Sequence, residues 1–235
     1  MESKDKNEEV TYKKKLRIEL IIHSIILIIL LIICGWDRKV NIPKFPKNFL
    51  FLTQICLYTN IVYYSIGSYN NIKQQMTVNK NTKLLMLFNF NFCVSFVVFI
   101  MYWSLLFIDK TNLYRKDSKI QVPALLNMLL HGGVFTSNLV EIFFVNKRSK
   151  KPYISVIFYF FFTFIYLSFL YILKIFFDIK VYPFIYGNFL KFLLISLVSV
   201  IICLIGHYVY IFMTKQKDEK NDKNNYEEFE LTKTI

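Results

Sequence analysis

The stretch Leu84–Ile108 reads LLMLFNFNFCVSFVVFIMYWSLLFI and contains no Asp, Glu, Lys or Arg. A helix needs about 20 mostly apolar residues to cross the hydrocarbon core of a membrane, and this stretch supplies more. It lacks the strict alternation of apolar and polar residues that a membrane strand shows. Because backbone groups in lipid must bond within their own segment, the stretch predicts a membrane-spanning helix.

Five further stretches, two before this one in the chain and three after it, are also long and mainly apolar. The chain has 235 residues, of which 55% are apolar and only 19% charged, and a soluble domain of this length would need a more polar surface. We therefore predict an all-α fold, a six-helix transmembrane bundle over residues 16–213, with polar tails at 1–15 and 214–235 that we expect to be irregular. The six predicted spans are Leu16–Cys34, Phe49–Ser68, Leu84–Ile108, Val122–Val145, Tyr153–Phe177 and Phe189–Met213.

The formal charge of +13 does not indicate nucleic-acid binding, because Lys and Arg gather in short loops and tails, where they orient membrane helices. With a cytosolic N-terminus, 18 of them lie on the cytosolic side and 11 on the other side. This bias predicts a multi-pass protein with both termini in the cytosol. The membrane is the endoplasmic reticulum, another endomembrane or the plasma membrane.

Cysteine spacing and sequence motifs predict neither a metal site nor a cofactor. No CxxC pair occurs, and each cysteine lies within or at the edge of a predicted span, which is typical of small buried side chains. The G-x-S-x-G, P-loop, H-E-x-x-H and G-x-G-x-x-G motifs are absent. The four cysteines are Cys34, Cys56, Cys93 and Cys203.

Polar side chains inside lipid are costly, and the fourth predicted span carries a stripe of them. At about 100° per residue, Asn127, His131, Asn138 and Glu141 fall within roughly 80° of one another, with Thr136 opposite. The stripe should therefore face protein or water. One interpretation is a polar cavity lined by this span, in a non-enzymatic transporter, channel or scaffold. Two glycines directly after the histidine would let another backbone or a ligand approach closely.

The second predicted span has a weaker polar face of the same kind. Thr53, Asn60 and Tyr64 fall within roughly 40° of one another, and Gly67 extends the face. The second and fourth spans run in the same direction, so Thr53 and His131 should lie at similar depth. A hydroxyl beside an imidazole can form a nucleophile–base pair. A backbone bond of the threonine within its own helix and an interhelical bond of the histidine are the alternatives.

Other polar residues give weaker signals. Glu19 and His23 are four residues apart near the start of the first span, which favours a local contact between them or between Lys15 and Glu19. His207 is isolated in the sixth span and is expected to be structural.

Three short motifs in order resemble those of the androgen-induced gene 1 / FAR-17a family of six-span membrane proteins. They are Phe51-Leu52-Thr53, Pro123-Ala124-Leu125-Leu126-Asn127 and Val181-Tyr182-Pro183-Phe184. The similarity runs from about Phe49 through the sixth span.

The resemblance implies a threonine hydrolase of lipid esters, notably fatty acid esters of hydroxy fatty acids, with a lipid ester and the surrounding lipid as partners. It places the catalytic residues at Thr53 and His131, which the polar faces also select. Asn127 or Tyr182 would orient the imidazole or stabilise the oxyanion. Where the family often has an Asp three residues after the threonine, this chain has Cys56.

Overall fold

The computed structural model is almost entirely helical in the part of the chain that it describes, and no strand occurs there. It describes residues 2–41, 51–74, 82–108, 123–145, 152–179 and 189–233. The helical elements are α1 (Glu2–Asn41), α2 (Leu52–Gln74), α3 (Thr82–Ile108), α4 (Ala124–Met128), η4 (Leu129–Gly133), α5 (Val134–Val145), α6 (Pro152–Phe177) and α7 (Phe189–Lys233). Apart from Phe51 and Pro123, which directly precede α2 and α4, every described residue of the predicted spans lies within these helices. The elements α4, η4 and α5 together form the fourth span segment.

The two polar ends differ from the irregular tails that we expected. The helix α1 begins at Glu2, and α7 continues to Lys233. Both ends are rich in Lys and Glu and contain no Gly or Pro, so nothing in the sequence stops the helix where the apolar run stops.

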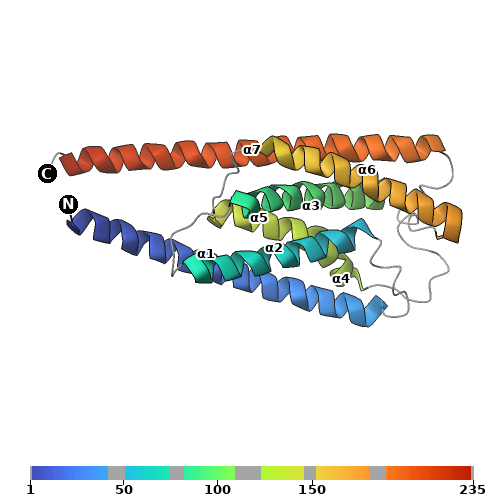
Figure 1. The fold of residues 1–235 in the computed structure, drawn as a ribbon, viewed down its shortest axis with the longest axis horizontal. Coiled ribbons are helices and arrows are strands. Elements are labelled where there is room, and N and C mark those ends of the chain that lie inside the picture. The colour runs from blue at the N-terminus through green and yellow to red at the C-terminus, as the bar shows by residue number, and fades with distance from the viewer. Residues whose placement is uncertain are drawn as a thin grey trace.

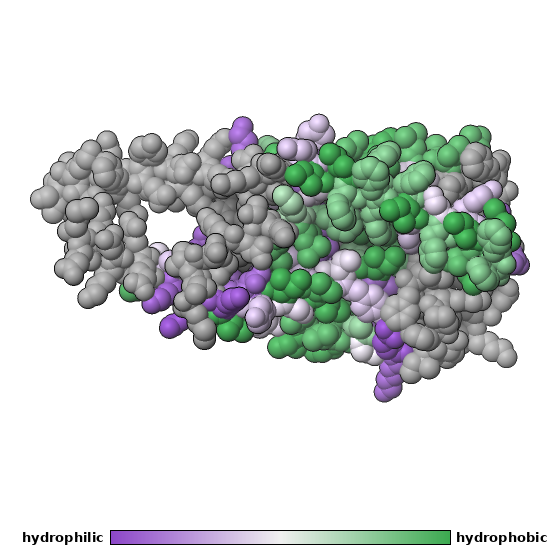
Figure 2. Space-filling view, in the orientation of Figure 1, coloured by the Kyte–Doolittle hydropathy of each residue, from purple (hydrophilic) through white to green (hydrophobic). Residues whose placement is uncertain are grey.

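Four of the described helices are long and apolar enough to cross a membrane. The candidate spans within them are Val10–Val40, Leu84–Ile108, Tyr153–Phe177 and Leu193–Lys215. Large apolar side chains cover the outside of α1, α6 and α7, and Figure 2 shows them as a broad green band between more polar regions. Soluble proteins rarely expose apolar patches of this extent, so the protein is a membrane protein.

The helix α3 occupies the centre of the bundle and packs against α2, α5, α6 and α7. Its aromatic side chains build the core: Phe88 contacts Tyr63 of α2, and Phe92 contacts Phe135 of α5 and Tyr210 of α7. The helix α1 lies mainly along α2. This arrangement puts α2 between α1 and α3, where polar side chains of α2 meet protein instead of lipid.

The start of α1 and the end of α7 lie at the same end of the bundle, here called the terminal end (Figure 1). The helices α2 and α5 both run from the opposite end toward the terminal end (Figure 1). The parallel course predicted for the second and fourth segments is therefore confirmed.

Candidate active site

The fourth helical segment contains one wide turn. Residues Leu129–Gly133 form the π-helical element η4, between the regular helices α4 and α5. A π turn holds about one residue more than an α turn, and such turns occur frequently at functional sites. Gly132 and Gly133 lower the cost of leaving the regular helix because they add no side chain. A Cβ placed on Gly132 would meet no atom within 4 Å, so the turn is open on the side of Gly132.

The two residues selected from the polar faces come together at this turn. Thr53 lies in the first turn of α2, and His131 lies in the middle of η4. The Thr53 Oγ1 is 3.3 Å from the His131 Nδ1, at the long end of the hydrogen-bond range. Hydrogen bonds between catalytic groups are often this loose before substrate binds. Both residues are half-buried, so each keeps some exposed surface.

Contacts with α1 fix the first turns of α2. The Gln54 side-chain amide donates a hydrogen bond of 2.8 Å to Asp37, and the Arg38 guanidinium donates one of 3.1 Å to the Tyr58 hydroxyl. Asp37 and Gln54 are both buried. These bonds hold the helix start that carries Thr53 against the end of α1.

A third helix completes the surroundings of His131. The Tyr102 ring of α3 stacks on the imidazole, with 3.7 Å between ring centroids and 6° between ring planes. The Asn127 side-chain amide donates a hydrogen bond of 2.7 Å to the Tyr102 hydroxyl. Asn127 is thus joined to His131 through Tyr102. Sequence reasoning missed Tyr102, because one more aromatic residue in an aromatic-rich span gives no signal.

The family resemblance also drew attention to Tyr182 and Cys56, and the structure describes only Cys56. Tyr182 and its motif lie outside the described residues. Cys56 is buried one turn after Thr53, and its thiol lies 3.7 Å from the Asn60 side-chain nitrogen. The Asn60 amide also donates to the Cys56 carbonyl oxygen within the same helix.

The predicted polar stripe of the fourth segment does face protein, but it contacts several helices. Asn138 donates a hydrogen bond of 2.9 Å to the Ser95 hydroxyl of α3, while Glu141 contacts α1 and α2. The wide turn rotates the residues after it by about 100° relative to a regular helix, which spreads the stripe around the buried side. Thr136 is exposed, as predicted, and donates to the Gly132 carbonyl oxygen.

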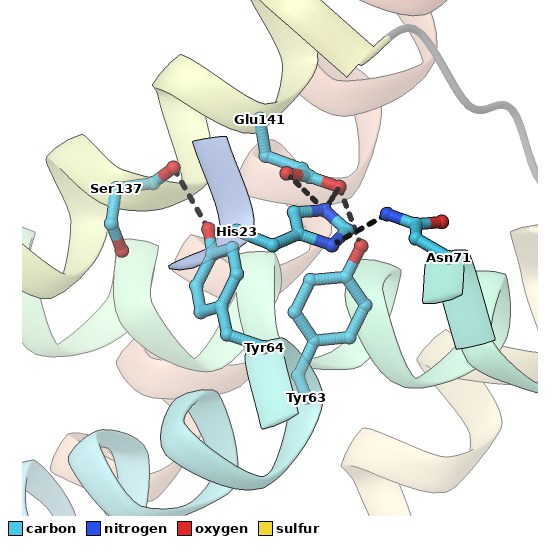
Figure 3. Close-up of polar contacts among 6 residues, drawn as sticks. All are labelled: His23, Tyr63, Tyr64, Asn71, Ser137 and Glu141. Atoms are coloured by element: carbon cyan, nitrogen blue, oxygen red, sulfur yellow. Dashed lines mark hydrogen bonds and ion pairs between the residues drawn. The ribbon is translucent and has the colours of Figure 1, made fainter. Parts of the chain in front are cut away.

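A second polar cluster lies nearer the terminal end, because Tyr63 follows Thr53 along α2 and both α2 and α5 run toward that end. Figure 3 shows its side chains. The His23 Nε2 of α1 is 2.9 Å from each carboxylate oxygen of Glu141, and the Tyr63 hydroxyl of α2 donates to the same carboxylate at 2.7 Å. The Asn71 amide nitrogen lies 3.3 Å from the His23 Nδ1 (Figure 3). An amide donor at Nδ1 leaves the proton of a neutral imidazole on Nε2, where it points at the carboxylate.

This pairing replaces the local contact that we predicted for His23. Its acidic partner in the structure is Glu141, 118 residues away, and not Glu19. Gly67 of α2 makes the approach possible, because a Cβ there would lie 2.7 Å from the His23 ring. The nearby Tyr64 hydroxyl donates to the Ser137 carbonyl oxygen at 2.9 Å and adds another bond between α2 and α5 (Figure 3).

The His23–Glu141 cluster and the Thr53–His131 pair differ in how deeply they are buried. His23 and Glu141 are 0% and 2% exposed, so no substrate reaches them without movement of the helices. Thr53 and His131 are half-buried beside an open turn. The His23–Glu141 cluster joins three helices, and the Thr53–His131 pair is the more exposed of the two groups.

Fold and site together define a helical membrane protein with a hydroxyl–imidazole pair near one end of its bundle. A family model described as FAR-17a/AIG1-like protein matches residues 18–217, and the chain belongs to this family. The comparisons with curated proteins and with solved structures gave no match.

Proposed function

We propose that the protein is an intramembrane hydrolase of lipid esters, with Thr53 as nucleophile and His131 as general base. The observation that carries the proposal is the 3.3 Å separation of the Thr53 hydroxyl and the His131 imidazole at the open π turn. Two parallel helices hold the pair, and the chain belongs to the family whose resemblance implies these two residues.

The reaction follows from the roles of the two groups. The Thr53 oxygen attacks the ester carbonyl while the His131 Nδ1 takes its proton. The tetrahedral intermediate collapses to an acyl-threonine, and the imidazolium gives the proton to the leaving alkoxide. Water then attacks the acyl-threonine, again with the imidazole as base. The second tetrahedral intermediate breaks its bond to the Thr53 oxygen, the imidazolium returns the proton to that oxygen, and a carboxylic acid leaves. Because Thr53 lies in the first turn of α2, the positive end of that helix favours the negative charge of both intermediates.

The surroundings of the pair favour a substrate with a long acyl chain. On α3, Phe107 and Ile108 are 85% and 78% exposed, and on α4, Leu125 and Met128 are also largely exposed. These apolar side chains flank the elements that carry the pair and its stacked tyrosine. An acyl chain can therefore stay in lipid while its ester group reaches Thr53. Fatty acid esters of hydroxy fatty acids, the substrates that the family resemblance implies, have this form.

We further propose that α2 and the segment Ala124–Val145 also cross the membrane, which makes six spans. Each covers more than the ~30 Å of a hydrocarbon core at about 1.5 Å per residue. Both are less apolar than the other helices because their polar side chains bond to protein: Tyr64 to Ser137 and Glu141 to His23. An even number of spans fits two termini at one end of the bundle, and the Lys/Arg bias assigns that end to the cytosol. The membrane is the endoplasmic reticulum, another endomembrane or the plasma membrane.

The alternative function, a transporter, channel or scaffold, would use the polar residues of the fourth segment as a pathway. Asn138 and Glu141 bond to side chains of other helices, and this supports a role in holding the bundle together. The 3.3 Å pair favours the hydrolase over this alternative.

Labelling of the purified protein with a fluorophosphonate probe tests the proposal, followed by assays on a panel of lipid esters. We expect Thr53→Ala and His131→Ala to reduce labelling and hydrolysis to background. Thr59→Ala is the matched control, since Thr59 lies on the same helix and bonds to the Cys56 carbonyl. Undiminished labelling of the Thr53→Ala protein would overturn the nucleophile assignment.

A further inference from the structure

A histidine base works only if its ring is held in one orientation, and another residue usually supplies that constraint. In the part of the chain that the structure describes, the His131 Nδ1 lies within hydrogen-bond distance of the Thr53 hydroxyl, and the ring stacks on the face of Tyr102. No described carboxylate bonds to the other ring nitrogen. The stacked tyrosine is therefore the contact that fixes the plane of the imidazole.

Tyr102 is itself firmly placed. It is buried, and the Asn127 amide donates to its hydroxyl at 2.7 Å. The edge of its ring also meets Trp103, with 5.5 Å between ring centroids. Asn127 lies one turn before His131, so its bond ties α3 to the start of the wide turn. The three residues form a chain of contacts from Asn127 through Tyr102 to His131.

We propose that Tyr102 is a positioning residue of the hydrolytic site, and that Asn127 acts on His131 through Tyr102. The parallel stack keeps Nδ1 directed at Thr53 and prevents the ring from rotating at the open turn. Once His131 has taken the threonine proton, the same aromatic face lies against an imidazolium cation, which it attracts. Tyr102 thus favours the charged state that forms during the reaction over the neutral state before it.

This inference rests on the proposed function, and its test separates the two. Tyr102→Leu removes the ring, and we expect kcat and the rate of fluorophosphonate labelling to fall roughly 10- to 100-fold, since a misplaced catalytic group costs about this much. KM should change by less than about 3-fold, because uniform substrate binding is untouched. Tyr102→Phe keeps the stack and should retain activity within about 3-fold. Tyr208→Leu, on the exposed side of α7, is the matched control and should behave as the wild type.

A double-mutant cycle tests the role of Asn127. Asn127→Leu should lower kcat in the wild-type background by no more than the roughly 3-fold allowed for Tyr102→Phe, because both variants remove the same hydrogen bond. In the Tyr102→Phe background, where the hydroxyl is already gone, Asn127→Leu should have little further effect. An equal effect in both backgrounds would show that Asn127 does not act through Tyr102. All variants are compared for a monodisperse elution profile in detergent, so that misfolded protein is not counted as inactive enzyme.

The outcomes distinguish the two proposals. If Thr53→Ala still labels, the hydrolase proposal fails whatever Tyr102 does. If Thr53→Ala is inactive and folded Tyr102→Leu labels at the wild-type rate, the hydrolase stands and the positioning role is wrong. If Tyr102→Phe is as impaired as Tyr102→Leu, the hydroxyl and not the stacked ring matters, and the inference is overturned.

Discussion

Glu141→Leu removes the acceptor that holds α1, α2 and α5 together near the terminal end. The carboxylate accepts from the Tyr63 hydroxyl at 2.7 Å and lies 2.9 Å from the His23 Nε2. All three side chains are buried, so the two former partners cannot turn to water. The substitution leaves two donors without their acceptor.

Two scales bear on the size of the effect. Breaking a buried ion pair in a soluble protein costs about 3–5 kcal/mol, because the unfolded state is solvated by water. Interhelical hydrogen bonds in membranes average only ~0.6 kcal/mol and reach ~1.7, because separated helices stay in lipid and find other partners. The second scale applies to a bundle in a membrane. With two partners lost, we expect Glu141→Leu to lower the free energy of unfolding by about 1–3 kcal/mol.

Reversible unfolding of the purified protein in mixed micelles measures this free energy. Glu141→Gln keeps the shape and one acceptor oxygen, and it should cost less than Glu141→Leu. His23→Leu in the Glu141→Leu background should cost less than in the wild type, because its partner is already absent. A loss below about 0.5 kcal/mol for Glu141→Leu, or fully additive effects of the two leucine substitutions, would refute the reasoning that this cluster holds the helices together.

Two further predictions follow from the packing. Gly67→Ala places a Cβ 2.7 Å from the His23 ring, so it should displace the imidazole and lower the free energy of unfolding by about 1–3 kcal/mol. Gly35→Ala is the control, because its Cβ would meet no atom within 4 Å, and it should not lower this free energy. Equal melting temperatures for the two variants would contradict this prediction. Asn138→Leu removes the 2.9 Å bond to Ser95 and should cost about 0.6–1.7 kcal/mol in the same unfolding assay, with Ser95→Ala giving little further loss in that background.

The helices and the Thr53–His131 pair were predictable because both depend on local sequence patterns. In apolar runs of about 20 residues or more, the backbone must satisfy its hydrogen bonds within the segment, and this favours a helix. Thr53 and His131 stood out because polar groups are rare in such runs, and the parallel course of two even-numbered spans put them at similar depth.

Features that depend on tertiary contacts were not predictable in this way. The π turn changes the angular position of everything after it, and an assumption of 100° per residue cannot reveal it. The partner of His23 lies on another helix, while Glu19, four residues away, offered a plausible local partner. Tyr102 is one of 16 tyrosines in a chain with 25 phenylalanines, so its role at the site had no signature in composition.

The wide turn has a mechanical consequence for the rest of its helix. A regular α-helix is the lower-energy winding, so η4 persists only because contacts on both sides hold it open. On the side before the turn and within it, these are the bonds of Asn127 and His131. On the side after the turn, they are the bonds of Asn138 and Glu141. Glu141 lies about 15 Å from His131 along the helix. We expect that loss of either set of bonds would let η4 return to a regular α-helix, and this would rotate the residues before the turn relative to those after it. The orientation of the imidazole is therefore tied to hydrogen bonds nearer the terminal end of the bundle, and we expect a variant there to change the proposed reaction without touching the substrate.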